Sequence, residues 1–320
     1  MAFELLPEVA QALARQHGVV ALESTLICHG LPRPYNGAVA VAIEQAVRDQ
    51  GAMPATVAVI DGRVNVGLSE VARRQLVEAP KVAKCTTRDL PYLLVNGGLG
   101  ATTIAATVFV ASQVGIKVMA TGGLGGVHRG GELSLDVSAD LEELARRPVV
   151  VVCSGIKSIL DQRRTLERLE THGVPIVGYR CEELPGFYTA ESGLAIPAID
   201  DVQSLGRLVR AHRALGLPGA IVVVQPPPPE HALAKPVMEQ LVAAAEAAAC
   251  EAGIHGPAQT PFMLRHMADR RRRHRAGQRR PGARQCPSRG CDRDRAGDGR
   301  RCGKSLTGLA RDLEESKTSS

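Results

Sequence analysis

The chain has 320 residues and a formal net charge of +6, and it is 44% apolar but only 2% aromatic, with no Trp. A chain of this length can bury a large core, which Ala, Val, Leu and Ile must build because aromatic side chains are scarce. This composition favours a layered α/β protein and argues against a module that stacks nucleic-acid bases on aromatic rings. No apolar run reaches the roughly 20 residues of a membrane span, and the acidic N-terminus lacks a signal-peptide pattern, so a cytoplasmic protein is expected.

Short apolar runs recur along the first 268 residues and predict β-strands. They cover residues 19–22, 56–60, 118–120, 149–153, 175–178 and 220–224. Most are continuous rather than alternating, as in strands that helices cover on both faces. Helices are predicted between them, over residues 37–50, 69–78, 101–115, 157–171, 201–215 and 233–252. The alternation predicts an α/β fold, a central mixed, mostly parallel sheet flanked by helices (an α/β/α sandwich), with ligands at the carboxyl ends of the strands.

The composition changes near residue 269. Residues 270–303 contain thirteen Arg and three Asp but no Val, Ile, Leu, Met, Phe or Tyr, so this stretch carries +10 and the rest of the chain about −4. Because it cannot build a core, we divide the chain into a domain, 1–268, and a C-terminal segment, 269–320, expected to be disordered. Its arginines could bind nucleic-acid phosphates, form a solvated tail, or result from a shifted reading frame in a GC-rich gene.

A glycine-rich segment, residues 121–131, directly follows the strand predicted at 118–120. Glycines let backbone N–H groups approach an anion, and His128 and Arg129 could supply positive charge. The spacing fits neither a Walker loop nor a dinucleotide fingerprint. A tight turn that only needs positive φ angles remains the alternative.

Two acidic residues flank the start of a further helix. Asp136 or Ser138 can cap that helix, which is the plainer interpretation. Asp136 and Asp140 are also four positions apart, so both carboxylates could face one cleft and hold a hard divalent ion or a proton.

A lysine follows the strand predicted at 149–153. Gly155 turns the chain there, and Lys157 is predicted in the first turn of the helix 157–171. The positive end of the helix dipole disfavours an ammonium group and so favours the neutral amine that Schiff-base chemistry requires. An exposed surface lysine is the alternative.

Glu23 closes the first predicted strand, among apolar residues. A carboxylate in that setting suits general-acid work, and a structural carboxylate in a salt bridge is the alternative. Lys84 and the helix start predicted at residues 100–103 look like anion-contacting groups. The residues alone therefore indicate an α/β enzyme with a phosphorylated ligand.

Six motifs occur in an order that resembles one family, the pseudouridine-5′-phosphate glycosidases, also met as indigoidine-synthase-A-like proteins. The similarity runs nearly continuously from about residue 7 to 268. The motifs are ALEST-x4-GLP (21–32), PATVAVIDG (54–62), GATT (100–103), ATGGLGGVHRG (120–130), DVSADL (136–141) and CSGIKSILD (153–161).

The resemblance implies cleavage of the C–C glycosidic bond of pseudouridine 5′-phosphate to uracil and ribose 5-phosphate. It implies a cytoplasmic homotrimer of α/β/α subunits with one Mn²⁺ per subunit, and neither a membrane nor a nucleic-acid partner. Lys157 matches the nucleophile that forms an imine with the ring-opened sugar, and Glu23 matches the proton donor. Asp136 matches the metal ligand, and His128 is expected near the phosphate. The substrate site is expected to include Lys84, Ile104, Ser138, Ala139 and Asp140.

The sequence departs from this family in two places. Residues 225–229 read QPPPP where relatives carry an Asn-Pro turn. After residues 260–264, which match, the expected Thr-Gly-Gly turn and asparagine-rich helix do not follow, as a frameshift near residue 269 would produce. The alternatives are therefore a catalytically impaired relative that binds ribose phosphates, nucleic-acid binding through the arginines, or a lysine-imine aldolase for another sugar phosphate.

Overall fold

The computed structural model describes residues 3–31, 33, 35–254 and 256–278. Its strands are β1 (Glu4–Leu5), β2 (Val19–Leu22), β3 (Met53–Ile60), β4 (Arg63–Val66), β5 (Ala83–Cys85), β6 (Gly100–Thr102), β7 (Val118–Ala120), β8 (Val150–Cys153), β9 (Ile176–Tyr179), β10 (Ala198–Ile199) and β11 (Ile221–Val224). Its α-helices are α1 (Pro7–Ala14), α2 (Tyr35–Asp49), α3 (Glu70–Glu78), α4 (Leu90–Asn96), α5 (Ile104–Gln113), α6 (Gly131–Ser134), α7 (Ala139–Arg146), α8 (Gln162–Thr171), α9 (Val202–Ala214), α10 (Lys235–Glu251) and α11 (Gln259–Gln278). Three other short helices are η1 (Leu26–Gly30), η2 (Thr87–Asp89) and η3 (Gly256–Ala258).

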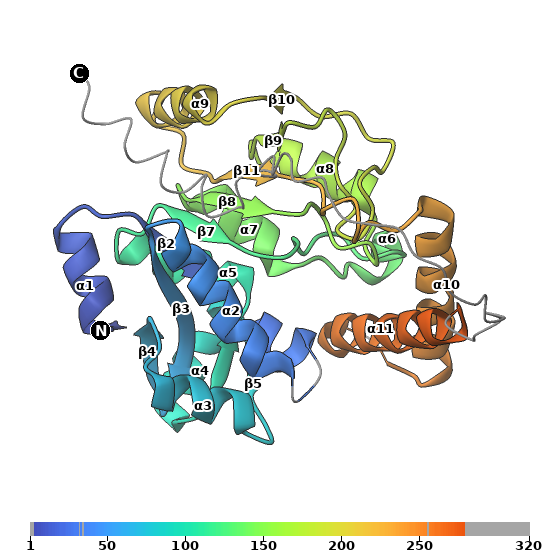
Figure 1. Ribbon diagram of the computed structural model, residues 1–320, viewed down its shortest axis with the longest axis horizontal. Coiled ribbons are helices and arrows are strands. Elements are labelled where there is room, and N and C mark those ends of the chain that lie inside the picture. The colour runs from blue at the N-terminus through green and yellow to red at the C-terminus, as the bar shows by residue number, and fades with distance from the viewer. Residues whose placement is uncertain (1–2, 32, 34, 255, 279–320) are drawn as a thin grey trace, which may run out of the picture.

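The strands form one mixed sheet, around which the helices are arranged (Figure 1). Over the described residues the order is β1-β4-β3-β2-β7-β8-β11-β9-β10, and β6 pairs with β3 and β5. From β3 through β10 this path is parallel throughout. The strands β4 and β6 pair with β3 in the antiparallel direction, and β1 and β5 run parallel to β4 and β6. The predicted mixed, mostly parallel sheet is confirmed.

Both faces of the sheet are buried, as its continuous apolar strands predict. Val20 and Leu22 point to the face that α2 and α9 cover, whereas Val19 and Ala21 join the core formed with α5, α7 and α8. The same alternation continues in β8 and β11. Helices on both faces make the molecule an α/β/α sandwich.

Two predicted helices begin later than expected. Residues 100–102 form β6, because they pair with β3 and β5, and Thr103 then caps α5 by accepting a hydrogen bond from the N–H of Ala106. The helix predicted at 157–171 begins only at Gln162, where the Asp161 side chain caps α8. In both places long-range pairing of the backbone overrides local helix preference.

The boundary expected at residue 268 falls inside α11, which runs from Gln259 to Gln278. Residues 269–278 are therefore helical, which corrects the expectation of disorder for that part. A helix propagates cheaply once begun, and the buried Met263 and Met267 anchor its first half. Residues 279–320 lie outside the described part of the chain. None of the described helices is both long enough and apolar enough to cross a membrane.

Candidate active site

The sheet divides at the carboxyl end of β2. The first half of β3 pairs with β2, and its residues Ala58 and Val59 pair with β6 instead. Since β4 occupies the other edge of β3 at those residues, β6 takes over the edge where β2 leaves. The carboxyl ends of the parallel strands β2, β7 and β8 therefore meet beside this division, which is where α/β sheets bind ligands.

Glu23 lies at this point, one residue beyond β2. Its two carboxylate oxygens accept hydrogen bonds from the hydroxyls of Thr25 and Thr121, the second of which directly follows β7. Behind it, the buried Ser24 hydroxyl donates to the carbonyl of Val57 at 2.7 Å and accepts from the N–H of Thr102 at 2.8 Å. Glu23 is thus held by two neighbouring strands.

The glycine-rich segment and the segment that contains Lys157 lie side by side. They continue the parallel pairing of β7 and β8 beyond the strands, through bonds from Ser154 N–H to the Gly122 carbonyl (2.9 Å) and from Lys157 N–H to the Leu124 carbonyl (3.1 Å). Lys157 is therefore in a loop five residues before α8, and the prediction that it occupies the first turn of a helix is wrong. Its position at the site comes from this pairing.

The glycines serve close packing more than anion binding. Backbone N–H groups of the segment are already used: that of Gly125 donates to Asp140 at 3.0 Å, and that of Val127 to Thr165 at 3.0 Å. A Cβ on Gly123 would lie 2.6 Å from the ring of Phe187. Within this segment only Gly130 has a positive φ, so the alternative of a turn that needs positive φ angles holds for that residue alone. The other glycines are required because a side chain would clash with a neighbour.

Phe187 is a site neighbour that the sequence reasoning missed. It has a positive φ of 67°, donates its N–H to the Ser154 carbonyl at 3.0 Å, and lays its ring over Gly122 and Gly123. A non-glycine residue in this strained region often marks a functional position. Its only sequence signal is the short Pro-Gly-Phe-Tyr segment after β9, which carries no periodicity.

Asp140 and Ser138 connect the site to two helices. The buried carboxylate of Asp140 accepts from the N–H of Ala105 in α5 at 2.9 Å as well as from Gly125. The Ser138 side chain caps α7, where Ala139 is the first residue. Asp136 precedes the helix, so the two carboxylates are not on successive turns of α7, yet both lie near enough to Lys84 to affect its pKa. Ile104 begins α5 with its side chain fully buried.

Lys84 has charged neighbours from three other segments of the chain. Desolvation by surrounding protein, and then the positive charge of Lys157, lower its pKa, while the carboxylates of Asp140, Glu23 and Asp136 act in the opposite direction. Four other predicted residues, from three further segments of the chain, therefore lie within electrostatic reach of Lys84. Both lysines share the space with three carboxylates.

His128 lies at the edge of this cluster. Its Nδ1 is 3.8 Å from the Asp136 carboxylate and its Nε2 is 3.5 Å from the hydroxyl of Thr260 at the start of α11. Burial lowers the pKa of His128, Asp136 raises it, and the charges of Lys84 and Lys157 lower it further. The described residues contain no group of three or more His, Cys, Asp or Glu side chains that could enclose a metal ion.

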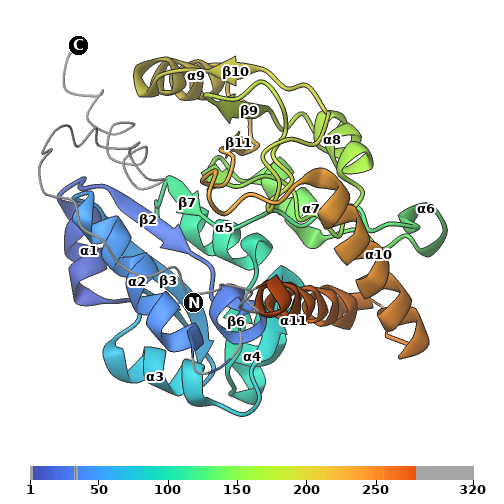
Figure 2. The ribbon, with the colours of Figure 1, turned by 45° about the vertical axis from the view of Figure 1, so that its right-hand side comes forward.

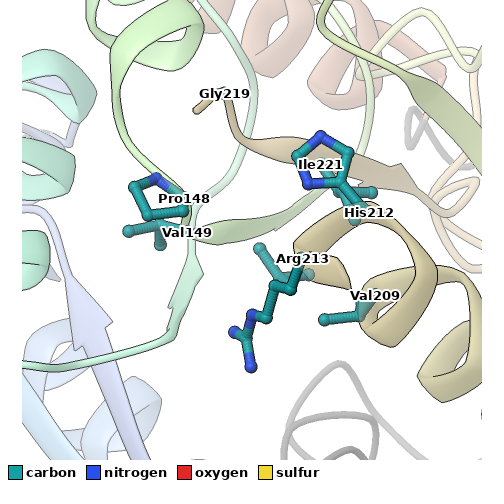
Figure 3. A pocket seen from close by; sticks show the side chains of 8 residues that line it. Pro148, Val149, Val209, His212, Arg213, Gly219 and Ile221 are labelled. Carbon is teal, nitrogen blue, oxygen red and sulfur yellow. The ribbon is translucent and has the colours of Figure 1, made fainter. Parts of the chain in front are cut away.

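A small pocket lies at the amino ends of the central strands β8 and β11, opposite the end of the sheet where Glu23 lies. Figure 3 shows its lining, which comes from the starts of β8 and β11 and from α9: Pro148, Val149, Val150, Val209, His212, Arg213, Gly219 and Ile221. These residues precede or flank the amino ends of the strands, away from Glu23 and Lys157. The pocket is therefore separate from the candidate active site.

An α/β sandwich with two lysines and three carboxylates gathered near the carboxyl ends of its central strands has the arrangement of an enzyme that acts on a small anionic substrate. Comparison with known proteins identifies the family within this class of enzymes. The family described as "Indigoidine synthase A like protein" matches residues 8–276. The chain belongs to this family.

Its relatives include named enzymes. The chain is 45% identical over 268 residues to the pseudouridine-5′-phosphate glycosidase of Hahella chejuensis, covering 83% of this chain and 88% of that protein. It is 50% identical over 265 residues to that of Herpetosiphon aurantiacus, covering 82% and 88%.

Two solved structures share the fold. The prealnumycin C-glycosynthase AlnA, crystallised with ribulose 5-phosphate, has a TM-score of 0.77 at 38% identity and covers 84% of this chain and 88% of its own. An indigoidine synthase A-like protein of Thermotoga maritima has a TM-score of 0.74 at 30% identity and covers 93% and 89%.

Proposed function

We propose that this chain cleaves the C–C glycosidic bond of pseudouridine 5′-phosphate to uracil and ribose 5-phosphate, reversibly. The observation that carries the proposal is that Glu23 and Lys157, which follow β2 and β8, both lie within electrostatic reach of Lys84 in β5, in a chain about half identical to enzymes of that name. A sugar phosphate also occupies the related AlnA structure.

The residue types suit this chemistry. A C-glycoside has no oxygen or nitrogen leaving group to protonate, so ordinary two-carboxylate hydrolysis is closed to it. Glu23, oriented by two hydroxyls, protonates the ring oxygen as the ribose opens. The amine of Lys157 attacks C1 and displaces the protonated ring oxygen, which gives an open-chain secondary amine that still carries the base. Protonation of the uracil carbon bonded to C1 then lets the nitrogen lone pair expel uracil, so the C–C bond breaks as the imine forms, and water hydrolyses the imine to release ribose 5-phosphate.

Asp136 is the proposed ligand of one Mn²⁺ per subunit. Its half-buried carboxylate is a hard oxygen donor of the kind Mn²⁺ prefers, and a single protein carboxylate suits an ion that keeps several waters. Bound there, the ion would neutralise negative charge on substrate oxygens.

We further propose that the enzyme is a cytoplasmic homotrimer. Exposed apolar side chains on and beside α6, Leu133 at 89% and Leu135 at 82%, support an interface there, because isolated subunits rarely present adjacent bare leucines. Light scattering on the protein as it elutes from a size-exclusion column measures its mass. A mass of three chains is expected, and the mass of one chain would contradict the proposed trimer.

The activity test is uracil release from pseudouridine 5′-phosphate with Mn²⁺. The unmutated chain should release uracil, Lys157→Ala should abolish release, and Lys81→Ala, which removes an exposed lysine that the proposal does not use, should not. Equal activity in Lys157→Ala would reject the proposed nucleophile.

A catalytically impaired relative is the second candidate, because the sequence from residue 265 onward contains no asparagine where the family places an asparagine-rich helix. A folded wild-type chain that binds ribose 5-phosphate but releases no uracil would favour it. Nucleic-acid binding depends mainly on arginines outside the described residues and stays a prediction. An aldolase acting on another sugar phosphate would reveal itself in a substrate panel.

A further inference from the structure

The division of the sheet at the end of β2 is closed by side chains instead of strand pairing. Thr56 is the last residue of β3 opposite β2, and Ala58 is the first opposite β6, so Val57 lies where the partner strand changes. Figure 2 shows the two branches: β2 lies beside β7, whereas β6 lies lower in the view. Because neither strand pairs with Val57 on this edge, its buried carbonyl needs other hydrogen-bond donors.

Two hydroxyls, one from each branch, supply these donors. Ser24 donates to the Val57 carbonyl at 2.7 Å and Thr102 donates to the same oxygen at 2.6 Å, which uses both of its lone pairs. The Ser24 hydroxyl also accepts from the N–H of Thr102 at 2.8 Å, and the N–H of Ser24 donates to the Thr102 carbonyl at 3.3 Å. We call Ser24 and Thr102 the hydroxyl pair. All these groups are completely buried, so no water competes for the four hydrogen bonds.

The hydroxyl pair lies between two residues of the proposed site. Glu23 directly precedes Ser24 and is the first residue beyond the paired part of β2. On the other branch, Lys84 of β5 pairs with Ala101, the residue before Thr102. Glu23 and Lys84 therefore belong to different branches of the sheet, and the hydroxyl pair joins those branches beside both of them.

We propose that Ser24 and Thr102 are positioning residues, which set where Glu23 lies relative to Lys84 by binding the two branches to the Val57 carbonyl. Neither hydroxyl contacts a substrate, because both are completely buried and bonded to the backbone. A proton donor works only within hydrogen-bond reach of its target, so movement of the branch that carries Glu23 slows proton transfer. The reaction served rests on the proposed function, whereas the joining of the branches does not.

Steady-state kinetics of uracil release by the full chain tests the positioning role. Ser24→Ala and Thr102→Val should each lower kcat by about tenfold or more and change KM by less than about twofold, because a displaced proton donor slows the chemical step without removing a contact to the substrate. Thr102→Ser keeps the hydroxyl and should restore most of kcat. Thr107→Val is the matched control, because it removes an equally buried hydroxyl, which donates to Thr102 at 3.0 Å, without touching the Val57 carbonyl.

Hydrogen exchange measures the junction of the two branches without any reaction. Peptides that cover residues 19–25 and 100–103 should exchange faster in Ser24→Ala and Thr102→Val than in the unmutated chain, because each variant removes hydrogen bonds that hold both segments. Thr107→Val should leave their exchange unchanged. Urea unfolding confirms that each variant is folded.

Unchanged kcat in Ser24→Ala and Thr102→Val, or an equal loss of kcat in Thr107→Val, would overturn the positioning role. So would a loss in Thr102→Val that Thr102→Ser does not restore, or unchanged exchange in both variants of the hydroxyl pair. A wild-type chain that releases no uracil, with faster exchange confined to those two variants, would instead refute the proposed function and leave the junction standing.

Discussion

At the scale of single residues, the acidic and basic side chains of the site differ in the hydrogen bonds that hold them. Glu23 and Asp140 have both carboxylate oxygens engaged by hydrogen bonds within the protein, whereas Lys84 meets only the charges of its neighbours. The carboxylates are therefore fixed in place by the fold. The amine of Lys84, by contrast, is not held by a hydrogen bond to another described residue.

Thiol reactivity is a direct test of burial around the site. Burial raises the pKa of Cys28, Cys85 and Cys153 to about 12, so at pH 8 roughly one thiol in ten thousand is ionised at each. Brief treatment of the native protein with iodoacetamide should therefore modify the exposed Cys250 and spare these three. Peptide mass spectrometry reads out each site separately, and early modification of Cys28 would mean that η1 opens in solution.

His212 should make the fold sensitive to acid. Burial, followed by the charge of Arg213, lowers its pKa from 6.5, so the folded state binds fewer protons than the unfolded state below that pH. Stability should fall as the pH drops below about 6.5, and His212→Gln should reduce the fall. Urea unfolding at pH 7.5 and 5.5 measures both, with the exposed His17→Gln as control, and an identical pH dependence in His212→Gln would contradict the assignment.

At the scale of elements, the site depends on three segments that lock together. The segment after β8 bonds to the glycine-rich segment on one side and to the Phe187 segment on the other, where the buried Ser158 hydroxyl donates to the Gly186 carbonyl. Gly155 is central, because it has φ +94° and an added Cβ would lie 1.8 Å from the Pro185 carbonyl oxygen. The backbone here leaves no room for a side chain.

Gly155→Ala should therefore cost far more stability than a glycine replacement that meets no neighbour. Gly173→Ala is the matched control: its φ is +66° and nothing lies within 4 Å of an added Cβ. The control should lose about 1 kcal/mol from backbone strain, and Gly155→Ala about 2 kcal/mol or more beyond that, from overpacking. Chemical denaturation compares them, and equal losses would show that the three segments separate easily.

At the scale of the whole molecule, α11 joins the C-terminal part of the chain to its beginning. It packs on α10 and reaches η1, so residues near both ends of the described chain share one corner of the site. This docking rests on Met263 and Met267, which are 1% and 3% exposed. The helix is therefore part of the folded core, although its sequence soon becomes rich in arginine.

Met263→Ala should lower the free energy of unfolding by about 2–5 kcal/mol, the usual cost of emptying a buried site. Arg270→Ala, on the exposed side of the same helix, should change it by less than about 0.5 kcal/mol. Thermal and urea unfolding compare the two variants. A negligible effect of Met263→Ala would show that α11 is detached in solution.

Much of the fold follows from local pattern. The strands predicted at 19–22 and 118–120 coincide with β2 and β7, and the other ten elements that were predicted begin or end within a few residues of their predicted bounds. Continuous apolar runs are recognisable because they form strands of a sheet that is covered on both faces. Short elements such as β1, β4 and β5 were not predicted. The sequence also identifies the chemical groups of the site, since a Gly, Lys or Glu that follows a predicted strand can be found without knowing which residues it contacts in the fold.

Only the tertiary structure decides how these groups meet. Lys157 leaves the predicted helix because its segment pairs with the glycine-rich one, and Phe187 reaches the site because the chain folds back after β9. Thr260 comes near His128 only because buried methionines dock α11 against the core. Sequence by itself determines which residues are apolar, basic or acidic and in which order they occur, because these are local properties. Which of them become neighbours depends on strand pairing and helix packing between distant segments, and that is a property of the folded chain alone.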